Sequence, residues 1–250
     1  MQQFFDPYSL RARIFPLWLV LFPLSLALYL WAPDALKGYT AGGSVVLAGA
    51  LWAFGAQITR TAGRSREKAL FASWDGPPTT RFLRHGNAEL NEHTRRRYHK
   101  VLAARLPDLA LPTEAEQEAD CIVADRKYAA CADYLRTQTR DPVKFAEVQR
   151  ENIHYGFLRN LWGMKTIGVL ATVLSLAATA YLLRVQGPTL AASAQRGVLV
   201  ALALQVCILL FWIFWVRADK IKLAAEEYAR RLLETCDRLD APSPAQAKLP

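Results

Sequence analysis

The sequence predicts an all-α membrane protein with four transmembrane helices arranged as two hairpins. Four stretches of the chain contain no charged side chain: residues 14–32, 38–59, 166–183 and 197–216. Each contains about 20 residues, enough for a helix to cross the hydrocarbon core of a bilayer. The stretches lie in pairs separated by short turns, and a charged segment, residues 60–165, separates the two pairs.

The first apolar stretch is interpreted as a permanent membrane span. Arg11 and Arg13 precede it, as basic residues precede a signal peptide. However, the stretch is longer than the apolar region of a typical signal peptide, and no cleavage motif of the Ala-x-Ala type follows it. In the second stretch, small residues recur near one helix face, which predicts close packing against another helix. These small residues are Gly42, Gly49, Ala53 and Ala56.

The distribution of Lys and Arg predicts the orientation of the spans. The only basic residues in the two short turns are Lys37, Arg184 and Arg196. The other basic residues close to the spans lie toward the termini and the charged segment: Arg11, Arg13, Arg60, Arg64, Arg66, Lys68, Arg159, Lys165, Arg217, Lys220 and Lys222. Because basic flanks stay in the cytoplasm, we expect both termini and the charged segment there.

This topology divides the chain into six parts, of which the central one is a mostly helical module. The parts are a cytosolic lead (1–13), hairpin 1 (14–59), a basic cytosolic helical module (60–165), hairpin 2 (166–216), a C-terminal cytosolic helix (217–240) and a disordered tail (241–250). Neither Gly nor Pro interrupts the C-terminal helix, so we expect it to continue the fourth span. Its apolar seam is expected to pack on the module or on a second copy of the chain.

Capping signals divide the module into helices. A basic helix is expected to begin at Thr79 or Thr80 and to end before Pro107. Thr113 and Glu116 form a capping-box pattern, which predicts a second helix that ends just before Asp141. A third helix is expected to begin at Asp141 and to lead into the third span.

The first half of the module is strongly basic. Residues 60–105 contain 11 Lys and Arg against four Asp and Glu, whereas residues 108–125 contain six acids and no base. Guanidinium groups donate hydrogen bonds to phosphates, and nearby aromatic rings stack on bases. The candidate residues for binding a nucleotide or oligonucleotide are Arg81, Arg84, His85, Arg95, Arg96, Arg97, His99 and Lys100. Two alternatives are that these residues pair with the acidic stretch or contact anionic lipid head groups.

Two further groups of polar residues are candidates for transmitting and using a binding event. Just before the third span, one helix face carries candidate coupling residues; the alternative is that they cap the helix bundle. These are Glu151, Asn152, Tyr155 and Arg159. Within the third and fourth spans, a stripe of uncharged polar residues could line a narrow pore between copies of the chain; the alternative is that these residues pack helices together. The candidate pore-lining residues are Thr172, Ser175, Thr179 and Gln205.

The sequence provides no recognisable catalytic or metal-binding motif. The four histidines lie in the module without the spacing of a zinc site, and no Gly-x-Ser-x-Gly, Walker or dinucleotide-binding motif is present. The four cysteines form no Cys-x-x-Cys pair and are interpreted as thiols, since the cytoplasm is reducing. The spans contain almost no ionisable residue, which argues against an ion pump. We therefore expect no enzyme activity, no metal and no cofactor.

With its paired hairpins and basic cytosolic module, the chain resembles the membrane effectors of bacterial antiphage operons that respond to nucleotide signals. It is most similar in architecture to the channel-like effector of the Hailong defence type. The resemblance implies a homo-oligomeric channel, such as a tetramer, in the bacterial inner membrane, with an oligonucleotide basin at residues 81–100 and a pore formed by the third and fourth spans. It also implies a nucleotidyltransferase encoded in the same operon as a partner.

The function expected from the sequence is that of a membrane channel or pore gated by a nucleotide or oligonucleotide bound to the basic module. Binding there would bias the module between two arrangements, and the helix before the third span would transmit the bias. The alternative is a scaffold without a channel, which anchors a cytoplasmic partner at the membrane.

Overall fold

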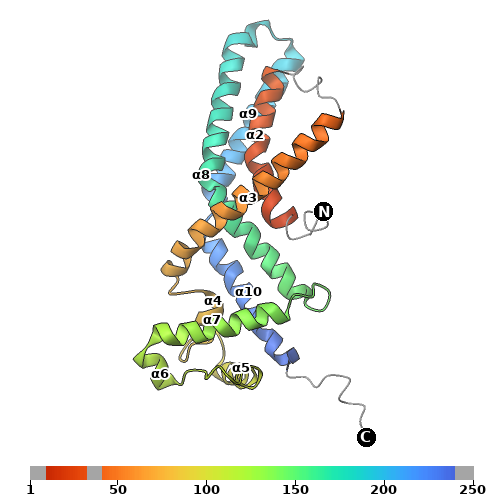
Figure 1. The fold of residues 1–250 in the computed structure, drawn as a ribbon. Helices are drawn as coiled ribbons and strands as arrows, with labels where there is room; N and C mark the ends of the chain where they lie inside the picture. Colours follow the sequence, from red (N-terminus) through yellow and green to blue (C-terminus); the bar gives the residue numbers. More distant parts are fainter. Residues whose placement is uncertain (1–9, 33–40, 240–250) are drawn as a thin grey trace. The chain divides into compact units, whose positions relative to one another are not determined.

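The structure of the protein, a computed structural model, describes residues 10–32 and 41–239. Side chains are described for residues 12–32 and 53–239. Within these ranges the regular secondary structure is helical and includes no strand, which confirms the predicted all-α class (Figure 1). The predicted tail, residues 241–250, lies outside the described part of the chain.

The chain forms two compact units that alternate along the sequence. We call them the apolar unit, Met1–Lys68 with Gly156–Ile221, and the charged unit, Ala69–Tyr155 with Lys222–Pro250. Three helices continue across the boundaries: α3 (Ala41–Ser73), α8 (Ala146–Gln186) and α10 (Ala218–Leu239).

Three helices of the apolar unit are long and apolar enough to cross a membrane. These segments are Ala12–Trp31, Ala146–Thr189 and Ala192–Trp215. They correspond to the first, third and fourth predicted spans. The second predicted span, residues 38–59, begins outside the described residues and continues in α3, whose side chains are described only from residue 53. That span therefore remains a prediction.

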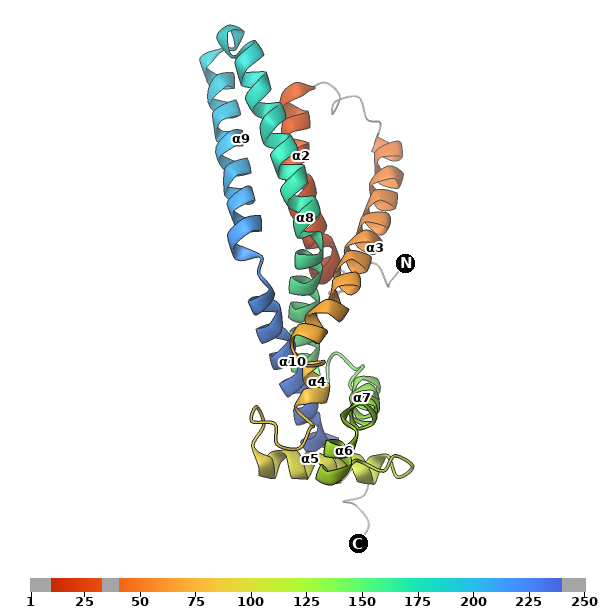
Figure 2. The same ribbon diagram turned by 90° about the vertical axis from the view of Figure 1, so that its left-hand side faces the viewer.

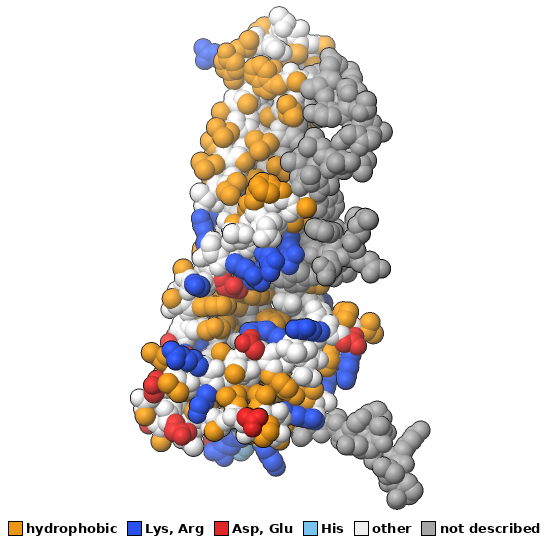
Figure 3. Space-filling model, viewed as in Figure 1, with side chains coloured by type: hydrophobic (Ala, Val, Ile, Leu, Met, Phe, Trp, Pro, Cys, Tyr) orange, Lys and Arg blue, Asp and Glu red, His pale blue; other side chains and the backbone are white. Residues whose placement is uncertain are grey.

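Helices α2 (Phe15–Trp31), α8 and α9 (Ala192–Leu210) lie side by side in the apolar unit (Figures 1 and 2). Trp31, at the end of α2, donates a hydrogen bond from Nε1 to the carbonyl oxygen of Ala178 at 3.1 Å and stacks on Tyr181 of α8. Many large apolar side chains on the outside of these helices are exposed, as the orange patches in Figure 3 show. Exposed apolar side chains along such helices are expected where lipid replaces water as the solvent.

Helices α3 and α8 approach each other closely because glycines face each other at the crossing. A Cβ atom added to Gly163 would lie 2.5 Å from the backbone of Ala62 and Gly63. A Cβ atom added to Gly63 would lie 2.2 Å from Oδ1 of Asn160. The amide of Asn160 in turn donates a hydrogen bond to the carbonyl oxygen of Ala12 at 2.8 Å. Small residues thus allow backbone contact between helices, as in membrane proteins generally.

A buried ion pair ties α3 to α8 at the same crossing. Nη1 of Arg159 lies 3.0 Å from Oε1 of Glu67, and Nε and Nη2 of Arg159 each lie 3.3 Å from Oδ1 of Asn160. The Arg159 side chain is only 10% exposed and that of Glu67 21%. A charge so poorly hydrated needs its partner to remain favourable.

The helix after the fourth span is interrupted, so the predicted continuous helix from residue 197 to residue 240 is wrong. Helix α9 ends in a π-helical turn, Phe211–Trp215; Val216 is extended, and α10 begins only at Ala218. The amine of Lys165 donates hydrogen bonds to the carbonyl oxygens of Ile213 (3.1 Å) and Val216 (2.8 Å). These bonds satisfy carbonyl groups that the break removes from the helix ladder. A lysine about 50 residues away in sequence thus stabilises a helix break at a position where neither Gly nor Pro occurs.

The charged unit contains a hydrophobic core to which α10 contributes. Its helices are α4 (Pro78–Arg81), α5 (Glu92–Arg105), α6 (Glu114–Ala119), α7 (Cys121–Gln138) and the ends of α3, α8 and α10. Ala229, Leu232, Leu233 and Cys236 of α10 are fully buried in a cluster with residues such as Phe82 and Leu135. The apolar seam of the C-terminal helix was expected to pack on the module or on a second copy of the chain. In the structure it packs on the module of the same chain.

Helix boundaries in the charged unit depart from the predictions at three places, one of which is the helix expected from Asp141, which begins only at Ala146 as α8. The basic helix, α5, begins at Glu92 with Asn91 as its cap, because residues 82–91 form turns. The capping box of Thr113 and Glu116 is confirmed by both of its hydrogen bonds. However, the helix that it starts ends at Ala119, because Asp120 accepts hydrogen bonds from the next backbone amides and caps α7. An aspartate that caps a new helix therefore splits the single helix predicted there.

Candidate functional site

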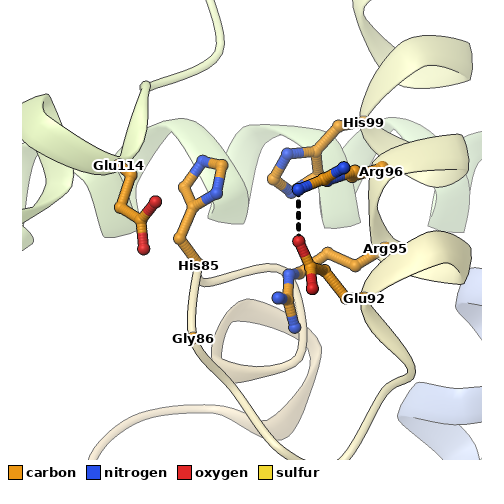
Figure 4. Close-up of a pocket in the computed structure, with 7 residues that line it drawn as sticks. All are labelled: His85, Gly86, Glu92, Arg95, Arg96, His99 and Glu114. Atoms are coloured by element: carbon orange, nitrogen blue, oxygen red, sulfur yellow. Dashed lines mark hydrogen bonds and ion pairs between the residues drawn. The ribbon is translucent and has the colours of Figure 1, made fainter.

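A cavity of about 230 Å³ in the charged unit brings together four of the eight predicted ligand-binding residues (Figure 4). The lining residues come from the turn after α4, from α5 and from the first turn of α6. They are His85, Gly86, Glu92, Arg95, Arg96, His99 and Glu114, and we call this cavity the basic pocket.

Backbone hydrogen bonds fix His85 in the wall of the basic pocket. Nε2 of His85 lies 2.9 Å from the carbonyl oxygen of Pro112, so this nitrogen carries the proton and donates. The side-chain amide of Gln117 accepts a hydrogen bond from the His85 amide at 2.8 Å and donates one to the His85 carbonyl at 3.2 Å. Gly86 follows with a φ of 73°, a conformation that suits glycine and turns the chain sharply toward α5.

His99, on α5, is held in one orientation and stays neutral at pH 7. Its Nε2 donates to the carbonyl oxygen of Leu83 at 2.7 Å, and its ring stacks on Tyr128 and meets the edge of His85 at 5.1 Å between centroids. Burial lowers the pKa of His99, and the nearby His85 and Arg95 lower it further, although the bond to Leu83 opposes the shift. A neutral His99 can offer the unprotonated Nδ1 only as a hydrogen-bond acceptor.

Two consecutive arginines of α5 supply the positive charge of the basic pocket. The Arg95 residue is 6% exposed, and its Nη1 donates to the carbonyl oxygen of Asn87 at 2.7 Å. Within the described residues, Arg95 donates only through Nη1, which leaves its other guanidinium nitrogens without a protein acceptor. Arg96 is largely exposed and pairs with Glu92 one turn earlier on the helix. Glu92 and Glu114, which also line the pocket, balance the charges of the two arginines.

The other four predicted ligand-binding residues lie outside the basic pocket. Arg84 binds Asp125 through two hydrogen bonds of 2.8 and 2.6 Å and also pairs with Asp75; these contacts raise the pKa of Arg84. The remaining residues and their partners are Arg81 with Glu226 at 3.5 Å, Arg97 with Asp237 at 2.8 Å, and Lys100, which is exposed. For Arg81, Arg84 and Arg97, this placement favours the alternative of pairing inside the unit.

Sequence reasoning did not nominate three lining residues of the basic pocket. Gly86 belongs to no motif, and Glu114 is an acidic residue in the first turn of α6. Glu92 lies four residues before Arg96 on α5, and this i, i+4 spacing of opposite charges was the signal that could have identified it.

The candidate coupling residues lie on both sides of a unit boundary, which falls between Tyr155 and Gly156 of α8. In the charged unit, Tyr155 is buried and its ring lies parallel to that of Tyr228 of α10, with 6.2 Å between centroids. Glu151 pairs with Arg150 at 3.1 Å, and Asn152 is half-buried. Arg159 belongs to the apolar unit. Tyr155 and Arg159 thus contact different helices, α10 and α3.

The four candidate pore-lining residues form a buried polar cluster inside the apolar unit. Gln205 of α9 donates from Nε2 to Ser175 Oγ at 2.7 Å, to Thr179 Oγ1 at 3.1 Å and to the carbonyl oxygen of Pro23 at 3.3 Å. Thr172 donates to the carbonyl oxygen of its own helix at Gly168, at 2.7 Å. All four side chains are at most 1% exposed within one chain. This placement favours the alternative in which the residues pack α2, α8 and α9 together.

We expect the stability of the charged unit to fall as the pH drops below about 6.5, the ordinary pKa of histidine. The unfolded chain binds a proton on His99 at that pH, whereas the folded chain does so only at lower pH. Acid therefore favours the unfolded state. Chemical unfolding measured between pH 8 and pH 5 should show this loss, and a His99→Gln variant should show a smaller one. An equal loss in His99→Gln and wild type would show that His99 does not cause the effect.

The site offers hydrogen-bond donors for an anion and no activated nucleophile. Burial raises the pKa of Cys131 to about 11 and that of Cys236 to about 12, so both stay protonated and inert. No group of three or more metal-ligating side chains occurs among the described residues.

No family model, curated protein or solved structure matches this chain.

Proposed function

We propose that this protein is an oligomeric membrane effector, a channel or pore of antiphage defence gated by a nucleotide or oligonucleotide. The observation that carries the proposal is the continuity of α8 from Ala146 to Gln186. This helix begins directly after Phe145, and both Phe145 and Val148 of its first turn belong to the core of the charged unit. Further along, the same helix becomes one of the apolar helices of the other unit. A change in the packing at its start would therefore reach its membrane part through one continuous helix.

The ligand would bind in the basic pocket through a phosphate group. The phosphate would replace Glu92 as the partner of Arg96 and accept hydrogen bonds from the nitrogens of Arg95 that have no protein acceptor. One face of His85 or His99 would contact a base. Because the pocket joins the turn after α4 to α5 and α6, a ligand that prefers one arrangement of these elements would shift the charged unit toward it.

The test is binding of fluorescently labelled single-stranded oligonucleotides to the full chain in neutral detergent. We expect Arg96→Ala to weaken binding about tenfold, since a hydrogen bond between charged groups is lost. Lys100→Ala is the matched control, because Lys100 lies one turn later on α5, is exposed and does not line the pocket. It should change the affinity much less. Binding should also weaken as salt is raised.

Two results would contradict this function. Equal losses in Arg96→Ala and Lys100→Ala would mean that a diffuse basic surface, and not the pocket, attracts the probe. If neither higher salt nor Arg96→Ala changed the affinity, a nucleotide or oligonucleotide would not be the ligand.

A second candidate function is a scaffold without a channel, and the sealed polar cluster around Gln205 favours it. A pore needs polar groups that face a water-filled path, whereas these side chains are buried between helices of one chain. Conductance of planar bilayers that contain the purified protein separates the candidates. A scaffold gives no ion flux with or without oligonucleotide, whereas a channel gives flux that depends on it.

A further inference from the structure

The guanidinium group of Arg66 is held by two residues of α8. Its Nη2 donates a hydrogen bond to Oγ1 of Thr166 at 3.0 Å, and its Cζ lies 5.4 Å from the centroid of the Trp162 ring. Trp162 and Thr166 are four residues apart on a helix and so share a face. Arg66 follows Gly63 by one turn, so the close crossing of α3 and α8 brings it into this position.

Near the crossing with α8, α3 carries positive charges that no ion pair among the described residues neutralises. Among the described residues, Arg64, Arg66 and Lys68 form no ion pair, whereas Glu67 between them is used by Arg159. Trp162 and Thr166 fix the Arg66 side chain but contribute no negative charge. The remaining guanidinium nitrogens, Nε and Nη1, are available to an anion from outside the chain.

Arg66 of α3 contacts α8 at the point where the uncharged stretch of α8 begins, which is the level expected for lipid head groups. Thr166 begins the third uncharged stretch of the sequence, and Trp162 precedes it by one turn. Tryptophan is enriched where a helix leaves the hydrocarbon core. Beyond Thr166, the same face of α8 continues at intervals of four residues with Leu170 and Leu174, which are 59% and 67% exposed.

We propose that Arg66, Trp162 and Thr166 form a binding site for an anionic phospholipid, with the head-group phosphate on Arg66 and an acyl chain along Leu170 and Leu174. The positively charged guanidinium of Arg66 can donate charge-assisted hydrogen bonds to a phosphate, and the apolar stripe that follows suits a lipid tail. A free phosphate or nucleotide would use the first part of this site and gain nothing from the stripe. The site depends on α8 crossing a bilayer and is independent of ligand gating through the basic pocket.

The test compares thermal unfolding of the delipidated full chain in neutral detergent after addition of phosphatidylglycerol or phosphatidylcholine with the same acyl chains. We expect phosphatidylglycerol to raise the wild-type Tm by about 2–4 °C more than phosphatidylcholine does, as one charge near a lipid phosphate implies for a chain of this size. Arg66→Gln should lose most of this difference. Arg196→Gln should keep it, because Arg196 is an exposed arginine in α9, close to the turn that joins it to α8.

A second variant keeps the test valid if Arg66→Gln does not fold. Thr166→Val removes the hydroxyl that orients Arg66 but retains its charge, so we expect it to reduce the difference between the two lipids. Equal stabilisation of the wild type by both lipids would overturn the proposal. So would an equal loss in the Arg66 and Arg196 variants, or the same Tm shift with inorganic phosphate alone.

Discussion

Replacing Arg159 by Met should destabilise the apolar unit by about 3 kcal/mol, the lower end of the cost of breaking a buried ion pair. The variant leaves the Glu67 carboxylate, which is 21% exposed, without its guanidinium partner 3.0 Å away. It also removes the two bonds to Oδ1 of Asn160. Unfolding of the purified protein by increasing mole fractions of a denaturing detergent measures the change.

Two further variants make the Arg159 prediction specific. Arg217→Met is the control, because Arg217 and its partner Asp219 are 64% and 74% exposed, so the loss of this pair should cost less than about 0.5 kcal/mol. The double variant Arg159→Met with Glu67→Leu removes both charges and should recover most of the lost stability. A double variant as unstable as Arg159→Met alone would show that packing, and not the broken Arg159–Glu67 pair, causes the loss.

Replacing Gly163 by Ala should also cost about 3 kcal/mol, at the upper end for an overpacked site. The new Cβ would lie 2.5 Å from backbone atoms of Ala62 and Gly63, and backbone atoms cannot move aside as a flexible side chain can. Helices α3 and α8 would have to separate at their crossing. The same detergent unfolding assay measures the effect.

Gly197→Ala is the matched control for the crossing. Gly197 is also within a helix, but nothing lies within 4 Å of a Cβ atom added there. Its substitution should be neutral or slightly stabilising, since alanine is the better helix former. If Gly163→Ala were as stable as Gly197→Ala, the close approach of α3 and α8 would be disproved.

The sequence was sufficient to predict the helical class and most of the long helices. Apolar stretches of about 20 residues identify spanning helices because few other structures need them. The capping box at Thr113 was also predictable, since both of its hydrogen bonds are local in sequence. The break at Val216 was not, because the lysine that stabilises it, Lys165, is distant in sequence and adjacent only in the fold.

The basic pocket was predictable only in part, for the same reason. Composition identified a cluster of arginines and histidines, and His85, Arg95, Arg96 and His99 do line one cavity. Composition could not show which arginines already have partners. The partner of Arg97 is Asp237, 140 residues further along the chain, so only the fold reveals that this arginine is engaged. Likewise, the spacing of Thr172, Ser175 and Thr179 shows a shared helix face but not what that face contacts.

The proposed function requires the charged unit and the turn between α8 and α9 to lie on opposite sides of a bilayer. Cys121 is an exposed thiol of the charged unit, whereas Cys131 and Cys236 are buried; replacing the other exposed thiol, Cys207 of α9, by Ser leaves Cys121 as the accessible reporter. A membrane-impermeant maleimide should label Cys121 in inside-out membrane vesicles only. In the same background with Cys121→Ser added, Ser193→Cys, at an exposed position beside that turn, should be labelled only in right-side-out vesicles. Labelling of both positions from the same side would contradict the membrane topology on which the proposed function depends.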